Sequence, residues 1–420
     1  MKRVTLLAVG SRGDVEPCIA LALGLRAAGW TPRVAALAPF REVVEGHELA
    51  FVSLGELPSR FRTASPRTPS HAGVGGRALF WAVYQRLLAG YLPQFIEACE
   101  GAELIVHTGL AFAAYHVAEA MGVPCAALAF VPGVATSAFV NPLFVRRRLS
   151  VHPTWNRATF TVEQQLMVQT TGHVINSWRS SSLGLRPVPR RDLLEHRWAH
   201  THAMLIGVSP HLVARPADWD ARVHMVGPLL LTQAQSDAPE PALQTFVEGG
   251  TPPIYVGFGS MTHGDGARFT RATLTALRRV GRRGVLATGW GGLAPGDELG
   301  PDVHVVESVS HRWLFPRVAA AVHHAGAGTT TAALLAGCPA VLVPIDYDQR
   351  FWARRLADLR ASPEPIEPAK LSGRSLAAAL HAVLEPRYRA RVAKLRDGLR
   401  EEDGVAACVE ILERLFIDHA

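Results

Sequence analysis

The sequence predicts an α/β protein built from two Rossmann-like, doubly wound domains. Both halves of the chain alternate short apolar segments with helical ones, which is typical of parallel sheets covered by helices. Both halves also open on the same pattern, a strand followed by Gly-Ser and then Gly-Asp. A segment rich in Pro, Gln, Ser, Asp and Glu separates them. The expected units are an N-terminal domain over 1–228, a linker over 229–252, a C-terminal domain over 253–395, and a C-terminal helix over 396–420 that packs back on the first domain.

The first domain begins with uninterrupted apolar runs, the kind that form strands buried on both faces of a sheet. A helix over 17–29 follows the first run, with Pro17 near its first turn and Gly29 as a C-cap. Residues 55–77 are rich in Pro, Ser, Arg and Gly and predict a loop, whereas 132–200 are less regular and could form helices that line a cleft. The expected strands cover 3–9, 31–38, 102–108 and 124–130, and a second helix covers 111–122.

In the second domain the alternation restarts after the linker. A helix over 267–280 follows its first strand, and the tail over 387–416 has an amphipathic, helical pattern. The expected strands cover 253–260, 283–289, 303–308, 318–324 and 339–345.

Composition restricts the class of protein. The chain carries 43 Lys and Arg against 36 Asp and Glu, a net charge of +7, which suits an anionic small molecule as well as a nucleic acid. No zinc finger, RNA-binding motif or heptad region occurs, so we expect no nucleic-acid partner. The five Cys residues are widely spaced and lack a CxxC pair, which favours a reducing, cytoplasmic compartment. The N-terminal apolar run is too short for a secretory signal, and no run reaches the roughly 18 residues of a membrane span.

The most informative stretch is HHAGAGTTTAALLAG at 323–337. It joins the end of an expected strand to the start of a helix, the place where open α/β sheets bind ligands and where free N–H groups favour an anion. It lacks the spacing of a Walker A loop or of GxGxxG. The alternative is a tight, glycine-rich turn that holds no ligand. The groups that would form a diphosphate cradle are His324, Gly326, Gly328 and Thr329.

Other polar groups are expected at the same edge of the second sheet. Asp348 and Gln349 follow the strand over 339–345, and their side chains can bond to the hydroxyls of a sugar. Asp348 could instead only cap the following helix. Ser260 follows the first strand of this domain, where its hydroxyl could reach a phosphate or simply belong to a structural turn.

In the first domain, GSRGDVEP at 10–17 occupies the corresponding edge. Ser11, Gly13 and Asp14 lie there, and Asp14 could act as a general base that faces the anion site of the second domain. The competing interpretation is that Asp14 is a simple helix cap.

Five stretches in order carry a resemblance: GSRGDVEP, PIYVGFGSM, ATGWGGL, VHVVESVSHRWLFPRVAAAVHHAGAGTT and AGCPAVLVPIDYDQRFWARRLADL. They resemble the family 1 glycosyltransferases, in particular the bacterial branch shared by glycopeptide-antibiotic and sterol glucosyltransferases. The match runs over nearly the whole chain. It implies a GT-B fold, two Rossmann-like domains facing across a cleft, with a nucleotide-sugar donor held by the second. It also implies metal-independent transfer with inversion at the anomeric carbon.

The resemblance also implies roles for individual residues. Asp14 matches the proposed catalytic base of this branch. Two positions depart from the family pattern, because Ala325 replaces a usual glycine and Tyr347 stands where relatives often carry glycine, a change that could alter sugar choice. The donor-binding residues would be Ser11, Arg12, Gly13, Ser260, Trp290, Val309, His324, Gly326, Gly328, Thr329, Asp348 and Gln349.

The expected chemistry needs no metal and no cofactor beyond the co-substrate. Helix-end amides and His324 would stabilise the leaving diphosphate. We expect no metal-ligand cluster among the eighteen His residues, and His323 and His324 are adjacent and poorly placed to share an ion.

We therefore expect an enzyme that moves a hexose from a UDP- or dTDP-sugar to a hydroxyl of a lipophilic small molecule. The alternatives are a nucleotide-sugar epimerase on the same fold and a non-catalytic nucleotide-sugar binder, and both monomer and homodimer stay open. Aromatic residues of the first domain suit an apolar acceptor, although each could equally be ordinary core. The expected acceptor-binding residues are Phe80, Trp81, Phe139 and Phe144.

Overall fold

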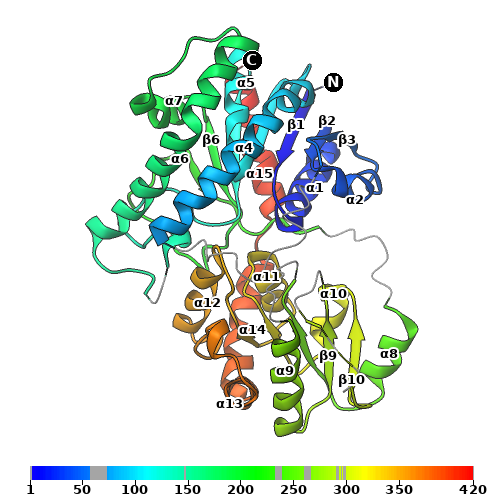
Figure 1. Cartoon of the computed structure of the whole chain (residues 1–420). Coiled ribbons are helices and arrows are strands. Elements are labelled where there is room, and N and C mark those ends of the chain that lie inside the picture. The colour runs from blue at the N-terminus through cyan, green and yellow to red at the C-terminus, as the bar shows by residue number, and fades with distance from the viewer. Residues whose placement is uncertain are drawn as a thin grey trace.

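Two lobes, each built on its own parallel sheet, form this computed structural model (Figure 1). The first sheet has seven strands in the order β3-β2-β1-β4-β5-β6-β7, and the second has five in the order β10-β9-β8-β11-β12. The predicted fold class is confirmed. The structure describes residues 2–56, 73–145, 148–231, 239–259, 266–289, 293–294, 296 and 299–419.

The first sheet contains every strand that the sequence predicts there and three more. β3, β6 and β7 are three or four residues long, too short to give a periodic signal. The strands are β1 Lys2–Ala8, β2 Trp30–Ala36, β3 Ala50–Ser53, β4 Leu104–Thr108, β5 Cys125–Ala129, β6 Ala203–Ile206 and β7 Val223–Met225.

The helices of the first lobe correct the predicted boundaries. α1 begins at Arg12 and not at Pro17, which therefore lies in its second turn, because Ser11 provides the N-cap. The stretch over 132–200 contains α6, a helix of 30 residues that packs along α4, and the short helix α7. The α-helices are α1 Arg12–Ala27, α2 Arg41–Glu45, α4 Gly73–Cys99, α5 Tyr115–Met121, α6 Pro153–Ser182 and α7 Leu193–Ala199, with 3-10 turns η2 Gly109–Ala114, η3 Pro142–Phe144 and η4 Arg190–Asp192.

The second lobe contains a strand within each of the five ranges predicted for it, and these strands are buried except for β10 at the sheet edge. The predicted linker is not wholly irregular, because it contains helix α8. The strands are β8 Ile254–Gly257, β9 Gly284–Ala287, β10 Val303–Val306, β11 Ala320–His323 and β12 Ala340–Leu342. The helices are α8 Pro241–Glu248, α9 Gly266–Val280, α10 His311–Leu314, α11 Ala327–Leu335, α12 Gln349–Asp358, α13 Gly373–Val383, α14 Pro386–Arg400 and α15 Gly404–His419.

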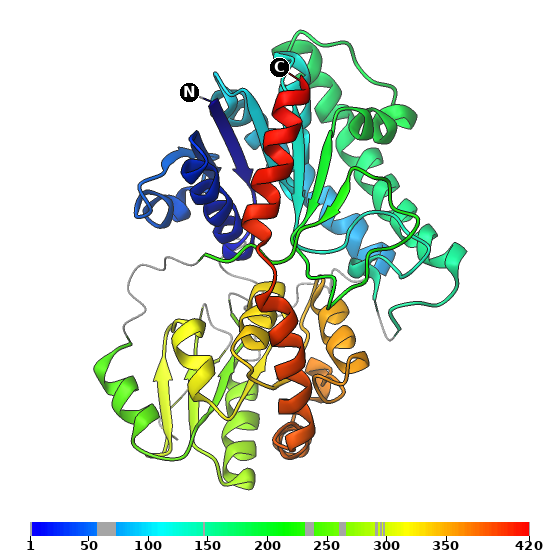
Figure 2. The same cartoon turned by 180° about the vertical axis from the view of Figure 1, so that it is seen from behind.

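The last helix returns to the first lobe (Figure 2). α14 packs on α11 of the second lobe, whereas α15 runs along α1. Gly24 allows the close approach of α15, since a Cβ there would lie 2.3 Å from Cγ1 of Val405. The ring of Trp30 meets the ring of Phe416 edge-on at 5.1 Å. Within the described residues, no helix combines the length and apolar character that a bilayer crossing requires.

One hydrophobic cluster joins the two lobes. It contains Phe139, Phe160 and Trp219 from the first lobe together with Phe351 from the second. The rings of Phe139 and Phe351 lie 5.9 Å apart, and Arg355 of α12 donates to the carbonyl of Leu212. These contacts fix the carboxyl edge of one sheet relative to that of the other.

Candidate active site between the two lobes

The predicted anion cradle forms one turn at the carboxyl edge of the second sheet. β11 ends at His323 and α11 begins at Ala327, with Gly326 as its N-cap. The amide of Thr330 bonds to the carbonyl of Gly326, so the preceding N–H groups of the first turn have no partner within the helix. Thr329 is half-buried and Gly328 is exposed. This helix start therefore presents free donors and the positive end of a dipole.

His324 is held between two glycines. Gly259 has a φ of +63°, and a Cβ there would lie 2.8 Å from Cε1 of His324, while a Cβ on Gly326 would lie 2.5 Å from Nε2. Nδ1 of His324 is buried and has no hydrogen-bond partner among the described residues. Burial, followed by the nearby His311, lowers the pKa of His324 to about 4. The ring is therefore neutral at pH 7, and its Nε2 is the nitrogen that lies beside Gly326 at the start of α11.

His323 and Ala325 fix the backbone of the cradle, and Ala325 does so in a strained conformation. His323 is fully buried, and its Nδ1 accepts the amide of Ala325 at 3.1 Å. Ala325 has a φ of +65°, the left-handed region that disfavours any residue with a Cβ by roughly 1–2 kcal/mol. The departure from the family glycine thus keeps the glycine conformation but adds backbone strain.

Asp14 lies at the start of α1 in the first lobe. Its Oδ2 accepts the amide of Ser11 at 2.8 Å and the hydroxyl of Ser11 at 3.1 Å. Gly10 permits this approach, because a Cβ there would lie 2.2 Å from Oδ2. Burial raises the pKa of Asp14 to about 6, although both bonds from Ser11 oppose that shift. Asp14 therefore caps the start of α1 through its Oδ2, whereas no described residue donates a hydrogen bond to its Oδ1.

Asp348 and Gln349 begin α12 on the second lobe. Oδ2 of Asp348 accepts the indole N–H of Trp352 at 2.7 Å, and the side chain makes no capping bond. Burial raises the pKa of Asp348 to about 6, and the charge of Asp14 adds to that rise. Oε1 of Gln349 accepts the amides of Ile345 and Asp346 at 2.7 and 3.0 Å, which fixes the turn and leaves its NH₂ group as a donor.

Two electrostatic contacts connect the lobes at this point. Asp14 of the first lobe acts on Asp348 of the second, and Arg12 contributes to lowering the pKa of His311, which burial brings to about 4. His311 also lies 3.2 Å from the hydroxyl of Tyr255. Sequence reasoning missed His311, although it stands two residues after the predicted Val309, which is half-buried.

The four predicted acceptor residues differ in their burial and in the part of the first lobe where they lie. Phe80 is half-buried and meets the ring of Tyr347 edge-on at 6.2 Å across the lobe boundary. Trp81 is buried and donates to Glu163 at 2.9 Å. Phe139 lies in the interlobe core described above, as the alternative interpretation had it, and Phe144 is half-buried in η3. Ser260 and Trp290 lie outside the described residues.

A group of potential metal ligands was not expected. His116, Glu119 and His196 bring their ligand atoms within 4.8 Å of one another, and His196 begins an H-x-x-x-H pattern that ends at His200. The expectation of no such cluster is therefore wrong. Arg179 donates twice to Glu119, at 2.5 and 3.0 Å, so a guanidinium already balances the carboxylate.

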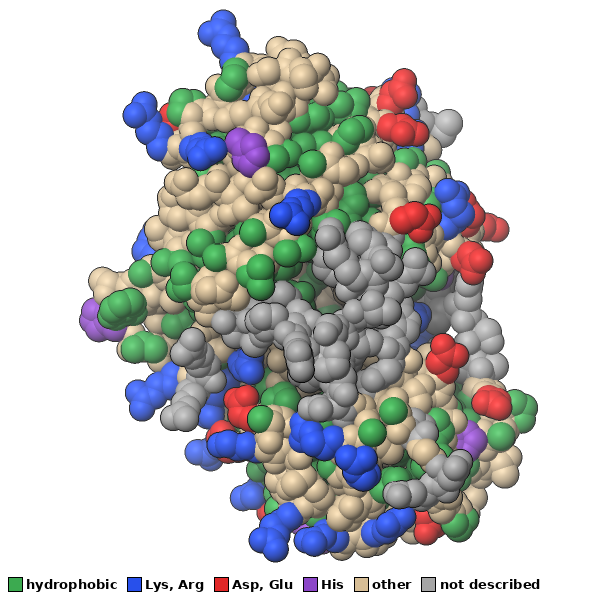
Figure 3. Space-filling view, viewed as in Figure 1, with side chains coloured by type: hydrophobic (Ala, Val, Ile, Leu, Met, Phe, Trp, Pro, Cys, Tyr) green, Lys and Arg blue, Asp and Glu red, His purple; other side chains and the backbone are tan. Residues whose placement is uncertain are grey.

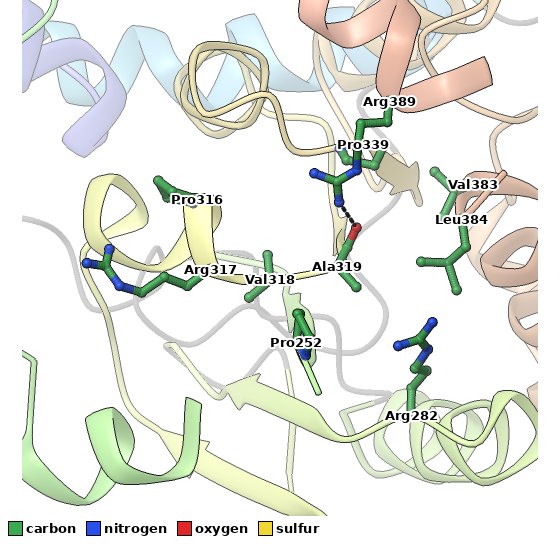
Figure 4. Close-up of a pocket in the computed structure, with 10 residues that line it drawn as sticks. All are labelled: Pro252, Arg282, Pro316, Arg317, Val318, Ala319, Pro339, Val383, Leu384 and Arg389. Carbon is green, nitrogen blue, oxygen red and sulfur yellow. Dashed lines mark hydrogen bonds between the residues drawn. The ribbon is translucent and has the colours of Figure 1, made fainter. Parts of the chain in front are cut away.

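Neither of two further surface features belongs to this site. A cavity of about 480 Å³ is lined by Pro252, Ala319 and Pro339, which precede β8, β11 and β12, so it lies at the amino edge of the second sheet, opposite the cradle (Figure 4). Basic side chains gather on the second lobe around α12 and α13 (Figure 3).

Comparisons with known proteins agree with this architecture. Residues 4–140 match the glycosyltransferase family 28 N-terminal domain, and residues 277–415 match the erythromycin biosynthesis protein CIII-like C-terminal domain. A sterol 3-beta-glucosyltransferase of Arabidopsis thaliana, UGT80B1, is 33% identical over 98% of this chain and 68% of its own length. The chain belongs to the family 1 glycosyltransferases. The predicted family and the predicted class of enzyme are confirmed.

Other relatives of this glycosyltransferase are longer. It spans 64% of UGT80A2 of the same plant, at 32% identity over 97% of the chain, and 27% of a Cryptococcus neoformans sterol 3-beta-glucosyltransferase, at 30% identity over 98%.

Solved structures share its GT-B fold. The glycosyltransferase of kitacinnamycin has a TM-score of 0.75 at 21% identity, with 99% of both chains covered. The glycosyltransferase VinC in complex with DTDP has a TM-score of 0.64 at 18% identity, covering 99% of this chain and 100% of its own.

Proposed function

We propose that this glycosyltransferase moves a hexose from a UDP- or dTDP-sugar to a hydroxyl of a lipophilic acceptor, with inversion and without a metal ion. The observation that carries the proposal is the electrostatic interaction between two carboxyl groups on opposite lobes. Asp14 and Asp348 each have a pKa raised to about 6, and the charge of Asp14 contributes to the raised pKa of Asp348. Asp14, which would take the acceptor proton, and Asp348, which would bind the donor sugar, would therefore act at the same boundary between the lobes.

The second lobe would hold the donor. The free N–H groups at the start of α11 and the imidazole of His324, whose Nε2 lies beside Gly326, would bond to the diphosphate. Asp348 and the NH₂ group of Gln349 would bond to sugar hydroxyls. The solved VinC complex with DTDP supports a nucleoside diphosphate as the ligand of this fold. The negative charge of the diphosphate would then be balanced by the amides and the dipole of α11 and by the imidazole of His324.

Asp14 would act on the acceptor. At pH 7 a carboxyl with a pKa of about 6 is mostly ionised but still basic enough to take a proton. As the acceptor oxygen attacks the anomeric carbon, Asp14 would take its proton, and the bond from that carbon to the diphosphate oxygen would break. The electron pair of that bond leaves with the diphosphate, where the donors at α11 stabilise the charge. Attack from the face opposite the leaving group gives inversion.

The acceptor class follows from the relatives. The curated relatives are sterol 3-beta-glucosyltransferases, and the solved neighbours include enzymes of antibiotic pathways such as calicheamicin. Phe80 and Tyr347 bring two aromatic rings to the lobe boundary, which suits a rigid, apolar molecule that carries a hydroxyl. The five cysteines are free and buried, which suits the reducing, cytoplasmic setting expected from the sequence.

The test is Asp14→Asn, assayed with UDP-glucose and dTDP-glucose on a 3β-hydroxysterol. We expect kcat to fall by about 100-fold or more, because general-base catalysis contributes on that order. Calorimetry should show UDP binding within a few-fold of wild type. Asp192→Asn, at the N-cap of α7, is the matched control. Retained turnover in Asp14→Asn would overturn the proposed base, and turnover of the sugar nucleotide without an acceptor would indicate an epimerase.

A further inference from the structure

Tyr347 has a strained backbone in the turn between β12 and α12. Its φ is +53°, in the left-handed region that disfavours any residue with a Cβ and in which a bulky side chain is rare. Four non-glycine residues of the described chain have such a φ, and two of them, Ala325 and Tyr347, lie in the turns that follow β11 and β12 at the candidate site. Strain of this kind gathers at functional sites, so it points to a role for the Tyr347 side chain.

Hydrogen bonds fix this turn on both sides of Tyr347. The amide of Tyr347 donates to Oδ1 of Asp346 at 2.9 Å, and Oε1 of Gln349 accepts the amides of Ile345 and Asp346. The backbone from which the ring projects is therefore held in place by its own neighbours.

The ring of Tyr347 reaches the first lobe. It meets the ring of Phe80 on α4 at 6.2 Å, with 82° between the ring planes. Burial raises the pKa of Tyr347 to about 12, and the carboxyl of Asp346 adds to that rise, whereas Arg77 of α4 opposes it. The neutral phenol thus stands between a carboxyl of its own turn and a guanidinium of the other lobe.

Both rings of this contact keep part of their surface exposed. Tyr347 and Phe80 are half-buried, whereas Trp81 and Tyr84, on which Phe80 packs, are buried. The ring of Phe80 stacks on that of Tyr84 at 5.9 Å and meets that of Trp81 edge-on at 5.2 Å. Phe80 therefore has a rigid support, and Phe80 and Tyr347 together form a fixed aromatic wall at the lobe boundary.

This wall borders the path of an acceptor. Tyr347 directly precedes Asp348, which would bind the donor sugar, and the charge of Asp14 contributes to the raised pKa of Asp348. An acceptor hydroxyl that gives its proton to Asp14 must approach a sugar held at Asp348. The groups beside that hydroxyl then come close to the ring of Tyr347, where a glycine would leave the space open.

We propose that Tyr347 selects the acceptor by limiting the space beside its reacting hydroxyl. This inference rests on the proposed function and narrows its substrate class to alcohols in which the carbons next to the hydroxyl-bearing carbon are unbranched. A branched neighbouring carbon would overlap the ring, and the fixed turn and Phe80 keep Tyr347 from moving aside. Discrimination then comes from a steric clash with the wrong acceptor and needs no added attraction to the right one.

The test compares a 3β-hydroxysterol that has only hydrogen on C4 with its 4,4-dimethyl analogue, using UDP-glucose or dTDP-glucose. Tyr347→Gly should lower the wild-type preference in kcat/KM for the unsubstituted sterol by about 10-fold or more, the effect of a methyl-sized misfit. Tyr347→Phe keeps the ring and should keep the preference. The methyl groups also hinder the hydroxyl chemically, so the decisive comparison is between variants.

Arg360→Gly is the matched control for backbone strain. Arg360 is exposed, lies in the same lobe and has a φ of +57°. Its replacement by glycine relieves a comparable strain away from the lobe boundary and should leave the sterol preference unchanged. UDP affinity, measured by calorimetry, should equal that of wild type in all three variants, which would show that the donor lobe is still folded.

Binding measurements separate this inference from the proposed transfer. Each sterol is titrated into enzyme saturated with UDP, and binding is followed by tryptophan fluorescence. Wild type should bind the unsubstituted sterol more tightly and Tyr347→Gly should bind the two alike, even if neither sterol is glycosylated. A preference that survives Tyr347→Gly, a change confined to the choice of sugar nucleotide, or no binding of either sterol by wild type would each overturn the proposal.

Discussion

The packing of His324 gives a sharp prediction for Gly259→Ala. The new Cβ would lie 2.8 Å from Cε1 of His324, so the imidazole must leave its present position in the cradle. The left-handed φ of +63° adds roughly 1–2 kcal/mol of backbone strain. Displacing His324 removes about one hydrogen bond to a charged group, roughly 1.5–3 kcal/mol, which corresponds to a 10- to 100-fold weaker UDP complex.

Gly281→Ala is the matched control for this experiment. Gly281 has a φ of +61° in the same lobe, but its Cβ would meet nothing within 4 Å. Both variants should lose a similar free energy of unfolding from strain, measured by urea denaturation. Calorimetry with UDP should distinguish them, because the position of His324 changes in one variant alone. Equal UDP affinity in the two variants would refute the steric argument and the role of His324.

Four other outcomes follow from the site. Ala325→Gly should raise the free energy of unfolding by about 1 kcal/mol in urea titrations, because it relieves a left-handed φ; a loss of stability would contradict the strain. Folding raises the pKa of Asp14 and Asp348 from 3.8 to about 6, so the unfolded chain ionises at a lower pH than the folded one. The free energy of unfolding should therefore fall as the pH rises from about 4 to 6. Asp14→Asn should make this fall smaller. The same ionisation predicts that kcat/KM rises through pH 6, and a flat profile there would argue against a carboxyl base. Trp352→Phe leaves Oδ2 of Asp348 without its donor and should cost about 1–3 kcal/mol of stability, with denaturation of Trp313→Phe, a half-buried tryptophan of the same lobe, as the comparison.

Local sequence signals were sufficient for most of the fold. Long apolar runs predicted β1, β2, β4 and β5 because strands buried on both faces need continuous apolar residues. The start of α1 was misplaced at Pro17, although Ser11 and Asp14 bond as a helix start and the helix begins at Arg12. α8 was taken for linker because its flanks are rich in Pro and polar residues.

The sequence by itself determined which residues stand at the carboxyl ends of the strands, because a βα turn and its glycines are local features. The resemblance supplied their expected roles and the pairing of Asp14 with a donor site. The tertiary structure decided what no local pattern determines: the burial and the nearby Asp14 that raise the pKa of Asp348, and the position of His311 within the field of Arg12. Burial and charge at one atom depend on segments that the chain brings together only after folding, so those properties appear with the packed structure alone.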